Sequence, residues 1–206
     1  MGGNVLEGLR DILAGRNDLQ MVQSLIGRNG EPETKCAAFR QALESFEDNS
    51  IDIALMKFCY VDFNGDTDID RLFACYKETV TEIRSKYPRV KVIPATVPLT
   101  VHPASWKRVA KMVLGRADNG ASNSKRSEFN ERMRSYYAGQ PVYDLAQVES
   151  TYPDGSRSSF VYGDQTAYSL ISRYTADGGH LNEVGRRLAA RELIRTLART
   201  AMTNGK

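Results

Sequence analysis

An aspartate and a histidine three residues apart, Asp177 and His180, stand in the segment TADGGHLN at residues 175–182. The two glycines between them let the backbone turn sharply, so both side chains can point the same way. A carboxylate held against one ring nitrogen of histidine fixes the tautomer and stabilises the imidazolium formed when the other nitrogen takes a proton. The pair can therefore serve as an oriented general base. The competing interpretation is structural: Asp177 begins a turn and His180 caps a helix terminus.

Several segments, read in chain order, resemble the SGNH/GDSL hydrolases. The segment DGGHLNEVG resembles that family's last block, D-x-x-H followed by a C-terminal helix, and one branch of the family has counterparts of GGNVLEGLRD, KFCYVDF, PATVPLT and VYDLAQVES. The resemblance implies a flavodoxin-like three-layer sandwich with a mostly parallel sheet. It also implies ester hydrolysis by a Ser–His–Asp triad that includes Asp177 and His180 and needs no cofactor. The implied substrate is a small-molecule ester or an acylated carbohydrate.

The family's serine block is missing from this sequence. That serine follows the first strand, just ahead of the segment that here reads GGNVLEGL, but the sequence starts at Met1. In the flavodoxin-like order this strand is interior, so its loss leaves neighbouring strands with unpaired backbone groups, at about 1–3 kcal/mol each. We therefore expect residues 1–206 to form a single SGNH-like domain whose first strand and serine lie about 15 to 30 residues upstream. For a complete chain, the alternative is a non-catalytic binding protein on a degenerate SGNH scaffold.

The family's G-x-N-D block, whose asparagine donates to the oxyanion, is also absent, because the strand IDIALM is followed by KFCY. Lys57 is a candidate cationic donor in its place, or else a lysine that extends from a strand end to solvent. Gly27 and Asn29, in the loop IGRNGEPETK, are candidates for a second donor or for substrate binding, or else form a plain turn. Ser24 and Cys59 lack the strand–turn–helix elbow of a nucleophile.

The charge balance and the lengths of the apolar runs limit the kinds of partner that the protein is expected to bind. The 206 residues contain 28 basic and 25 acidic side chains, mixed along the chain with a net charge of +3, so no basic face for nucleic acid is expected. No apolar run reaches the length of a membrane span, and the first residues show no signal-peptide pattern. The sequence as written therefore indicates a cytoplasmic location with no nucleic-acid partner, although an upstream leader would change the location.

Cysteine and histidine usage argues against disulfides and metals. Cys36, Cys59 and Cys75 form no C-x-x-C pair and leave one over, so we expect buried free thiols. The two histidines, His102 and His180, lie far apart and match no zinc motif. Phosphate-binding glycine loops are absent as well, and no cofactor is predicted.

Helical and strand patterns alternate along the chain, which is typical of an α/β fold with a mostly parallel sheet. The expected helices cover 4–14, the residues after Pro32, the residues after a capping box at Thr67 and Asp70, and a final helix capped by Asn182. The expected strands are 19–22, 51–56, 90–93 and 142–144, with a hairpin over 151–162 and a mobile loop or cap at 118–124.

Overall fold

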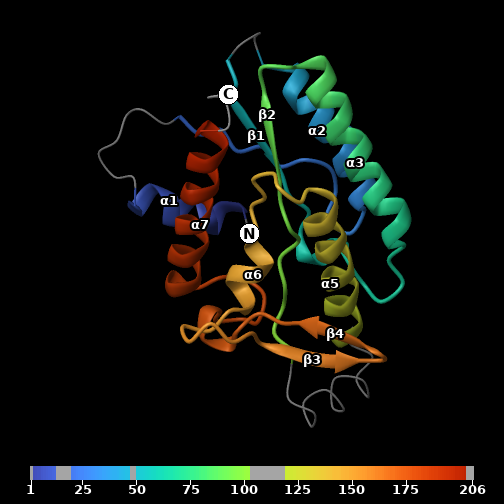
Figure 1. Ribbon diagram of the computed structural model, residues 1–206, viewed down its shortest axis with the longest axis vertical. Helices are drawn as coiled ribbons and strands as arrows, with labels where there is room; N and C mark the ends of the chain where they lie inside the picture. The colour runs from blue at the N-terminus through green and yellow to red at the C-terminus, as the bar shows by residue number, and fades with distance from the viewer. Residues whose placement is uncertain (1, 13–19, 47–49, 103–118, 203–206) are drawn as a thin grey trace.

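The computed structural model describes residues 2–12, 20–46, 50–102 and 119–202, whose arrangement Figure 1 shows. The chain is a mixed α/β protein. Two parallel strands lie at its centre with helices on both sides, and an antiparallel hairpin lies at one end. None of the described helices combines the length and the apolar character that a membrane crossing requires.

The central strands are β1 (Ile53–Met56) and β2 (Lys91–Pro94), which pair in parallel and in register. Both are short and apolar, as strands covered on two faces are. Just beyond β2, Ala95 pairs in parallel with Tyr143, which adds a third segment to the sheet. Within the described residues this parallel sheet is smaller than that of a flavodoxin-like three-layer sandwich, so the full sandwich stays a prediction.

One side of the sheet is covered by α2 (Pro32–Glu44), α3 (Ile69–Lys86) and α5 (Asn119–Tyr136). The apolar stripes of these helices enclose a core with the strand residues that point to this side. At its centre, the buried Tyr76 donates its hydroxyl hydrogen to the carbonyl of Met56 at 3.0 Å. This bond ties α3 to the carboxyl end of β1.

The opposite side is covered by α1 (Gly2–Ile12), α6 (Leu145–Ser150) and α7 (Glu183–Met202). A second core cluster joins these helices to the other face of the sheet. Gly8 permits close packing of α1 on α7, because a Cβ at this position would lie 2.8 Å from the carbonyl oxygen of Arg186.

Most of the residues predicted to start a helix are found at the start of one in the structure. Pro32 opens α2, where its fixed φ suits a first turn. Asn182 Oδ1 accepts the backbone N–H of Gly185 at 3.2 Å and so caps α7. At α3 the cap is one residue later than predicted, since Asp68 and not Thr67 accepts the N–H of the first turn.

The predicted hairpin over 151–162 is displaced along the chain. A tight turn does lie at residues 152–156, but it is closed by a single bridge between Thr151 and Arg157. The paired strands are β3 (Ser159–Tyr162) and β4 (Gln165–Tyr168), which follow it. Their two-residue turn contains Gly163 at φ +59°, the backbone region that tight hairpin turns require.

Three other expectations differ from the structure. Residues 20–22 form no strand, and residue 19 lies outside the described residues. The predicted strand 142–144 is reduced to the single pair at Tyr143. Residues 119–124, expected as a loop or cap, form the first turns of α5, whereas residue 118 is not described. Burial of the polar side chains Ser122 and Asn123 there outweighs their low helix propensity.

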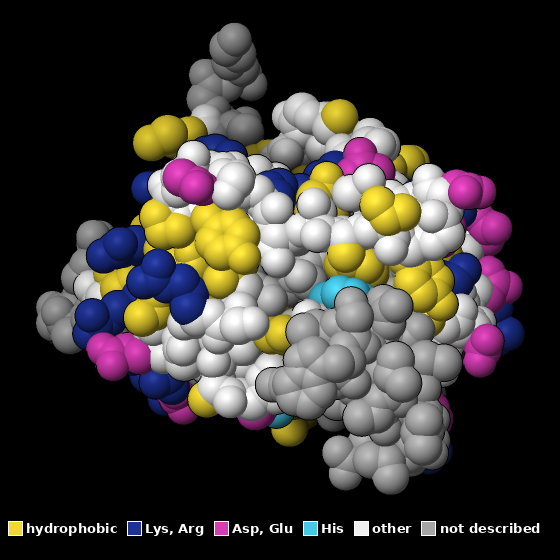
Figure 2. All heavy atoms as spheres, turned by 90° about the horizontal axis from the view of Figure 1, so that it is seen from below, with side chains coloured by type: hydrophobic (Ala, Val, Ile, Leu, Met, Phe, Trp, Pro, Cys, Tyr) yellow, Lys and Arg dark blue, Asp and Glu magenta, His cyan; other side chains and the backbone are white. Residues whose placement is uncertain are grey.

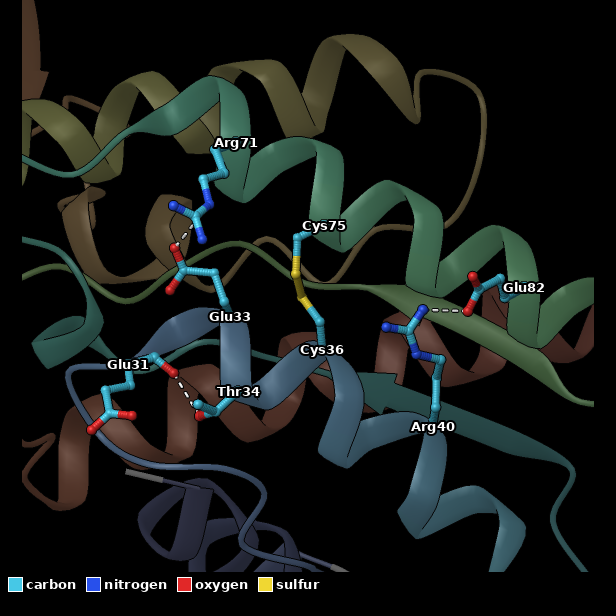
Figure 3. The surroundings of a disulfide bond; sticks show 8 residues. All are labelled: Glu31, Glu33, Thr34, Cys36, Arg40, Arg71, Cys75 and Glu82. Atoms are coloured by element: carbon cyan, nitrogen blue, oxygen red, sulfur yellow. Dashed lines mark hydrogen bonds and ion pairs between the residues drawn. A yellow bond between two sulfur atoms is a disulfide. The ribbon is translucent and has the colours of Figure 1, made fainter.

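A disulfide joins Cys36 of α2 to Cys75 of α3, with the two Cα atoms 6.3 Å apart (Figure 3). This corrects the prediction of free thiols for these two residues, while Cys59 is free. Packing of α2 on α3 brings together two cysteines 39 positions apart, which spacing alone does not reveal. Ion pairs between the same two helices flank the disulfide: Arg71 with Glu33 and Arg40 with Glu82.

Candidate functional site

The loop that carries the aspartate and the histidine folds back on itself just before α7. Thr175 pairs with Leu181 in an antiparallel bridge that brings the two ends of the loop together. Between them, Gly178 has a φ of +90° and donates its N–H to Thr175 Oγ1 at 3.0 Å. Glycine adopts this conformation without strain. The sharp turn that the two glycines predict is therefore present.

Asp177 and His180 face each other in this loop. Asp177 Oδ2 lies 2.5 Å from His180 Nδ1, while Oδ1 accepts the backbone N–H groups of Gly179 at 2.9 Å and of His180 at 2.7 Å. These hydrogen bonds, first of all the one from the His180 ring, hold the pKa of the Asp177 carboxyl well below its usual range. An ionised carboxylate keeps the proton on Nδ1 and leaves Nε2 as the basic nitrogen. We call this pair the Asp–His dyad.

The dyad is open to solvent on one side. The side chain of His180 is 49% exposed and that of Asp177 is 55% exposed. On the end of the molecule viewed from below in Figure 2, histidine (cyan) and hydrophobic (yellow) side chains both reach the surface; the chain has two histidines, His102 and His180. An oriented imidazole with this exposure can exchange a proton with a group that approaches Nε2.

Two segments that follow the parallel strands hold the dyad in place. Val101, in the segment after β2, donates its N–H to the carbonyl of Gly178 at 2.9 Å. Tyr60, in the short 3-10 helix η1 (Tyr60–Asp62) after β1, packs its ring edge-to-face on His180, with 5.8 Å between ring centroids. The dyad therefore lies beyond the carboxyl ends of parallel strands, where open α/β folds bind their ligands.

Gly27 and Asn29 lie in a loop that is anchored to η1. Lys35 Nζ donates to Asp62 Oδ2 at 2.7 Å and to Asn29 Oδ1 at 3.0 Å, and Gly30 N–H donates to Asp62 Oδ1 at 2.9 Å. Gly27 has a φ of +58°, and a Cβ there would lie 2.7 Å from the backbone nitrogen of Lys35. The loop thus has a fixed shape, and the amide oxygen of Asn29 is occupied by a lysine.

Lys57 directly follows β1 and is partly buried. Its ammonium group donates to the carbonyl of Phe58 at 3.0 Å, and burial lowers the pKa of this lysine. Across the described part of the chain, no hydrogen bond joins Lys57, Gly27 or Asn29 to the dyad. The structure therefore brings Asp177 and His180 together and leaves the three donor candidates on neighbouring loops.

Sequence reasoning missed two buried ionisable side chains, one on α5 and one on α6. Arg126 of α5 is 4% exposed, and burial lowers the pKa of its guanidinium to about 10. Glu149 of α6 is 1% exposed, and burial raises the pKa of its carboxyl to about 8. The segment VYDLAQVES contains Glu149, but an acid in a short amphipathic segment gives no signal of burial by itself. No three potential metal ligands among His, Cys, Asp and Glu cluster anywhere in the described ranges.

Two surface hollows lie away from the dyad. One, of about 280 Å³, is bordered by the first residues of β2, and the other, of about 540 Å³, lies between α2 and α3. Neither is lined by a residue of the loop 175–182. They are therefore separate from the candidate site.

No protein-family model matches this sequence, and no curated protein matches it significantly. Solved structures nevertheless share its fold. A protein from Streptococcus pneumonia, provisionally described as a platelet activating factor, superposes with a TM-score of 0.60 at 15% identity, covering 94% of this chain and 79% of that chain. A provisionally assigned acylhydrolase from Bacteroides fragilis gives a TM-score of 0.56 at 16% identity, covering 82% of this chain and 70% of that one. At such identities the likeness concerns the fold alone, a mixed α/β fold that this chain has in common with both structures.

Proposed function

We propose that this protein is an ester hydrolase of the SGNH type, in which Asp177 orients His180 as general base and then general acid. The observation that carries the proposal is the 2.5 Å contact between Asp177 Oδ2 and His180 Nδ1 on a half-exposed imidazole. The position of this dyad beyond the carboxyl ends of β1 and β2 supports it, as does the shared fold with a provisionally assigned acylhydrolase. The substrate class is a small ester or an acylated carbohydrate.

We propose further that the nucleophile is a serine outside residues 1–206, on a strand that pairs with β1. In the described part of the chain, β1 pairs with β2 along one edge and with no strand along its other edge. The segment 20–26 forms no regular structure and exposes 73% of Val22 and 96% of Leu25. An unpaired strand edge and an uncovered apolar segment are both expected where an interior parallel strand is missing.

In the proposed reaction, the serine Oγ attacks the ester carbonyl carbon while its proton passes to His180 Nε2. The imidazolium forms next to the Asp177 carboxylate, which stabilises its charge through Nδ1–H. The tetrahedral intermediate expels the alcohol, which takes the proton from Nε2, and an acyl-serine remains. Water then repeats the two steps and releases the acid. We assign the oxyanion contacts to the Gly27 N–H and Lys57, with Asn29 bordering the substrate.

Expression of the longer chain, read in frame upstream of Met1, tests this function. We expect hydrolysis of aryl acetates and labelling by a serine-directed fluorophosphonate. His180→Ala should lower kcat by about 10⁴–10⁶, at least as much as the loss of the aspartate that orients this base. His102→Ala is the matched control, because His102 stacks on Phe160 with 3.8 Å between ring centroids and is not part of the dyad. A stop codon directly upstream, or a His180→Ala variant with unchanged turnover, would exclude the mechanism.

The alternative is a binding protein on the same scaffold. The observation in its favour is that no serine hydroxyl or cysteine thiol hydrogen-bonds to His180 within the ranges the structure describes. In that case the longer chain would remain unlabelled by the fluorophosphonate and would not hydrolyse esters, although it would fold. Labelling at one serine decides for the hydrolase.

A further inference from the structure

Tyr60 forms a wall against the dyad loop. Its ring packs edge-to-face on the His180 ring, at an interplanar angle of 79°. Gly179 leaves room for this contact, because a Cβ there would lie 3.1 Å from Tyr60 Cζ and the ring would have to shift by a few tenths of an ångström. The histidine ring is therefore held by Asp177 at Nδ1 and limited by Tyr60 at its side.

Arg126 fixes the position of Tyr60. This buried guanidinium donates to the Tyr60 carbonyl from Nε at 3.1 Å and from Nη2 at 2.8 Å. Nη2 also donates to the Phe63 carbonyl at 3.3 Å, and Nη1 donates to Thr100 Oγ1 at 2.9 Å. Only the planar, five-donor fork of arginine can join these acceptors at once. Arg126 thus connects η1 to the segment after β2.

A second set of contacts from α5 reaches the dyad loop, residues 175–182, on the side opposite Tyr60. Asn123, one turn before Arg126 in α5, clamps the backbone of Thr100: its Oδ1 accepts the N–H at 3.1 Å and its Nδ2 donates to the carbonyl at 2.6 Å. The next residue, Val101, donates its N–H to the carbonyl of Gly178. Asn123 Oδ1 also accepts from Arg126 Nη1 at 2.6 Å, which joins the two paths.

We propose that Asn123 and Arg126 are positioning residues for His180, acting through Tyr60 on one side of the dyad loop and through Val101 on the other. The proposal rests on the hydrolase function above, since it assigns these residues to the general base of that reaction. They touch neither substrate nor the reacting atoms. Their role is to keep His180 Nε2 at a fixed point beyond the sheet, where a displacement of about 1 Å is enough to cost a large rate factor.

Asn130 provides a matched control on the same helix. Two turns after Asn123, it clamps the backbone of Val97 in the same manner, with its Oδ1 accepting the N–H at 2.7 Å and its Nδ2 donating to the carbonyl at 2.9 Å. Both asparagines are buried, and each bonds the backbone N–H and carbonyl of one residue in the same strand extension, while Asn123 also accepts from Thr100 Oγ1 at 3.3 Å. Residue 97, unlike residue 100, is not adjacent to a contact with the dyad loop. A purely structural role of Asn123 would lower stability without changing the tautomer of His180, whereas positioning predicts a changed tautomer in Asn123→Ala and an unchanged one in Asn130→Ala.

Ring ¹⁵N NMR of the 206-residue protein measures the tautomer of His180 directly, with His102 as the internal reference in a chain of two histidines. We expect the Nδ1–H tautomer in the unmodified protein and a shift of population toward Nε2–H in Asn123→Ala and Tyr60→Ala. Tyr60→Phe, which keeps the ring, and Asn130→Ala should leave it unchanged. In the longer chain, kcat should fall about tenfold in Asn123→Ala and Tyr60→Ala with little change in KM.

Equal effects of Asn123→Ala and Asn130→Ala on the His180 signals would overturn the proposal, as would the absence of any effect of Asn123→Ala and Tyr60→Ala. If Asn123→Ala does not fold, Tyr60→Ala against Tyr60→Phe decides. The NMR measurement needs no substrate, so loss of esterase activity in every form would reject the hydrolase function without deciding the positioning role. Retained esterase activity together with unchanged His180 signals in Asn123→Ala and Tyr60→Ala would support the hydrolase function and reject the positioning role.

Discussion

Glu149 makes the stability of this protein pH-dependent in a direction that can be measured. One of its carboxyl oxygens accepts the N–H of Leu99 at 2.6 Å, and the other, Oε1, has no hydrogen-bond partner in the described part of the structure. Burial raises the pKa of this carboxyl from 4.5 to about 8, although the Leu99 bond, Lys57 and Arg126 all act to lower it. The folded protein therefore keeps a proton that the unfolded chain releases.

The sign and size of the effect follow from linkage. Between pH 4.5 and about 8 the folded state binds more protons at Glu149 than the unfolded state, so the free energy of unfolding falls as the pH rises. The gap between the two pKa values corresponds to about 5 kcal/mol, most of it lost by pH 8. Glu149→Gln stays neutral at every pH, so this loss should be absent from the variant.

Urea unfolding at intervals from pH 4.5 to 8.5 measures the free energy of unfolding of the wild type and of Glu149→Gln. Other titrating groups are common to both proteins and cancel in the difference. Glu131→Gln, at a position 69% exposed on α5, is the control and should follow the wild type. If the difference between wild type and Glu149→Gln stays within about 1 kcal/mol over this range, Glu149 is ionised in the folded protein and the reasoning is wrong.

Three further predictions concern other contacts. Replacing Cys36 and Cys75 by alanine opens a cross-link that spans 39 positions, which should lower the free energy of unfolding by about 4 kcal/mol, whereas thiol titration of the unreduced wild type should find a single free thiol. Lys35→Met leaves the buried Asp62 carboxylate without its cation and should cost about 3–5 kcal/mol in the same urea assay; a change below 1 kcal/mol would contradict a buried pair. Asp177→Asn can still accept the backbone N–H groups of its loop, so the longer chain should fold normally but lose about 10⁴ in kcat, and unchanged turnover would remove the acid from the mechanism.

The features that the sequence predicts well are those encoded within a few residues. Pro32 and Asn182 mark helix starts that the structure shows, and Gly178 and Gly179 produce the turn that brings Asp177 to His180. The carboxylate–imidazole contact joins two residues three positions apart, so it can be read from a single segment of the sequence. Its catalytic role, in contrast, depends on a nucleophile from another segment and stays a prediction.

The polar face of α5 shows why the residues that support the dyad from this helix were not predicted from the sequence. Apolar periodicity identifies a helix by the face it buries, but α5 buries the polar Asn123, Arg126 and Asn130 beside only two large apolar residues, Phe129 and Met133. The two asparagines replace hydrogen bonds that the backbone after β2 would make in a sheet. The spacing of the three polar residues, by three and four positions, is helical, so a stripe of polar residues at that spacing was the available signal.

Contacts between segments far apart in the sequence also led to wrong or missing predictions. The disulfide between Cys36 and Cys75 and the ion pair between Lys35 and Asp62 both exist because α2 packs beside α3 and η1. A single sequence does not show which helices pack against each other. Both pairs follow directly from the positions of the helices in the structure, but neither can be predicted from the sequence alone.

The dyad is complete without a nucleophile because its own loop provides most of its hydrogen bonds. One oxygen of Asp177 accepts two backbone N–H groups and the Thr175 hydroxyl of the loop, and the other contacts the ring of His180, so the carboxylate cannot rotate without breaking four contacts. Tyr60 and Val101 then attach this rigid loop to the segments that follow β1 and β2. A strand added at the free edge of β1 would therefore meet a base that is already oriented. The cost of organising the histidine is met by folding, and the proposed serine needs only to be brought within reach of Nε2.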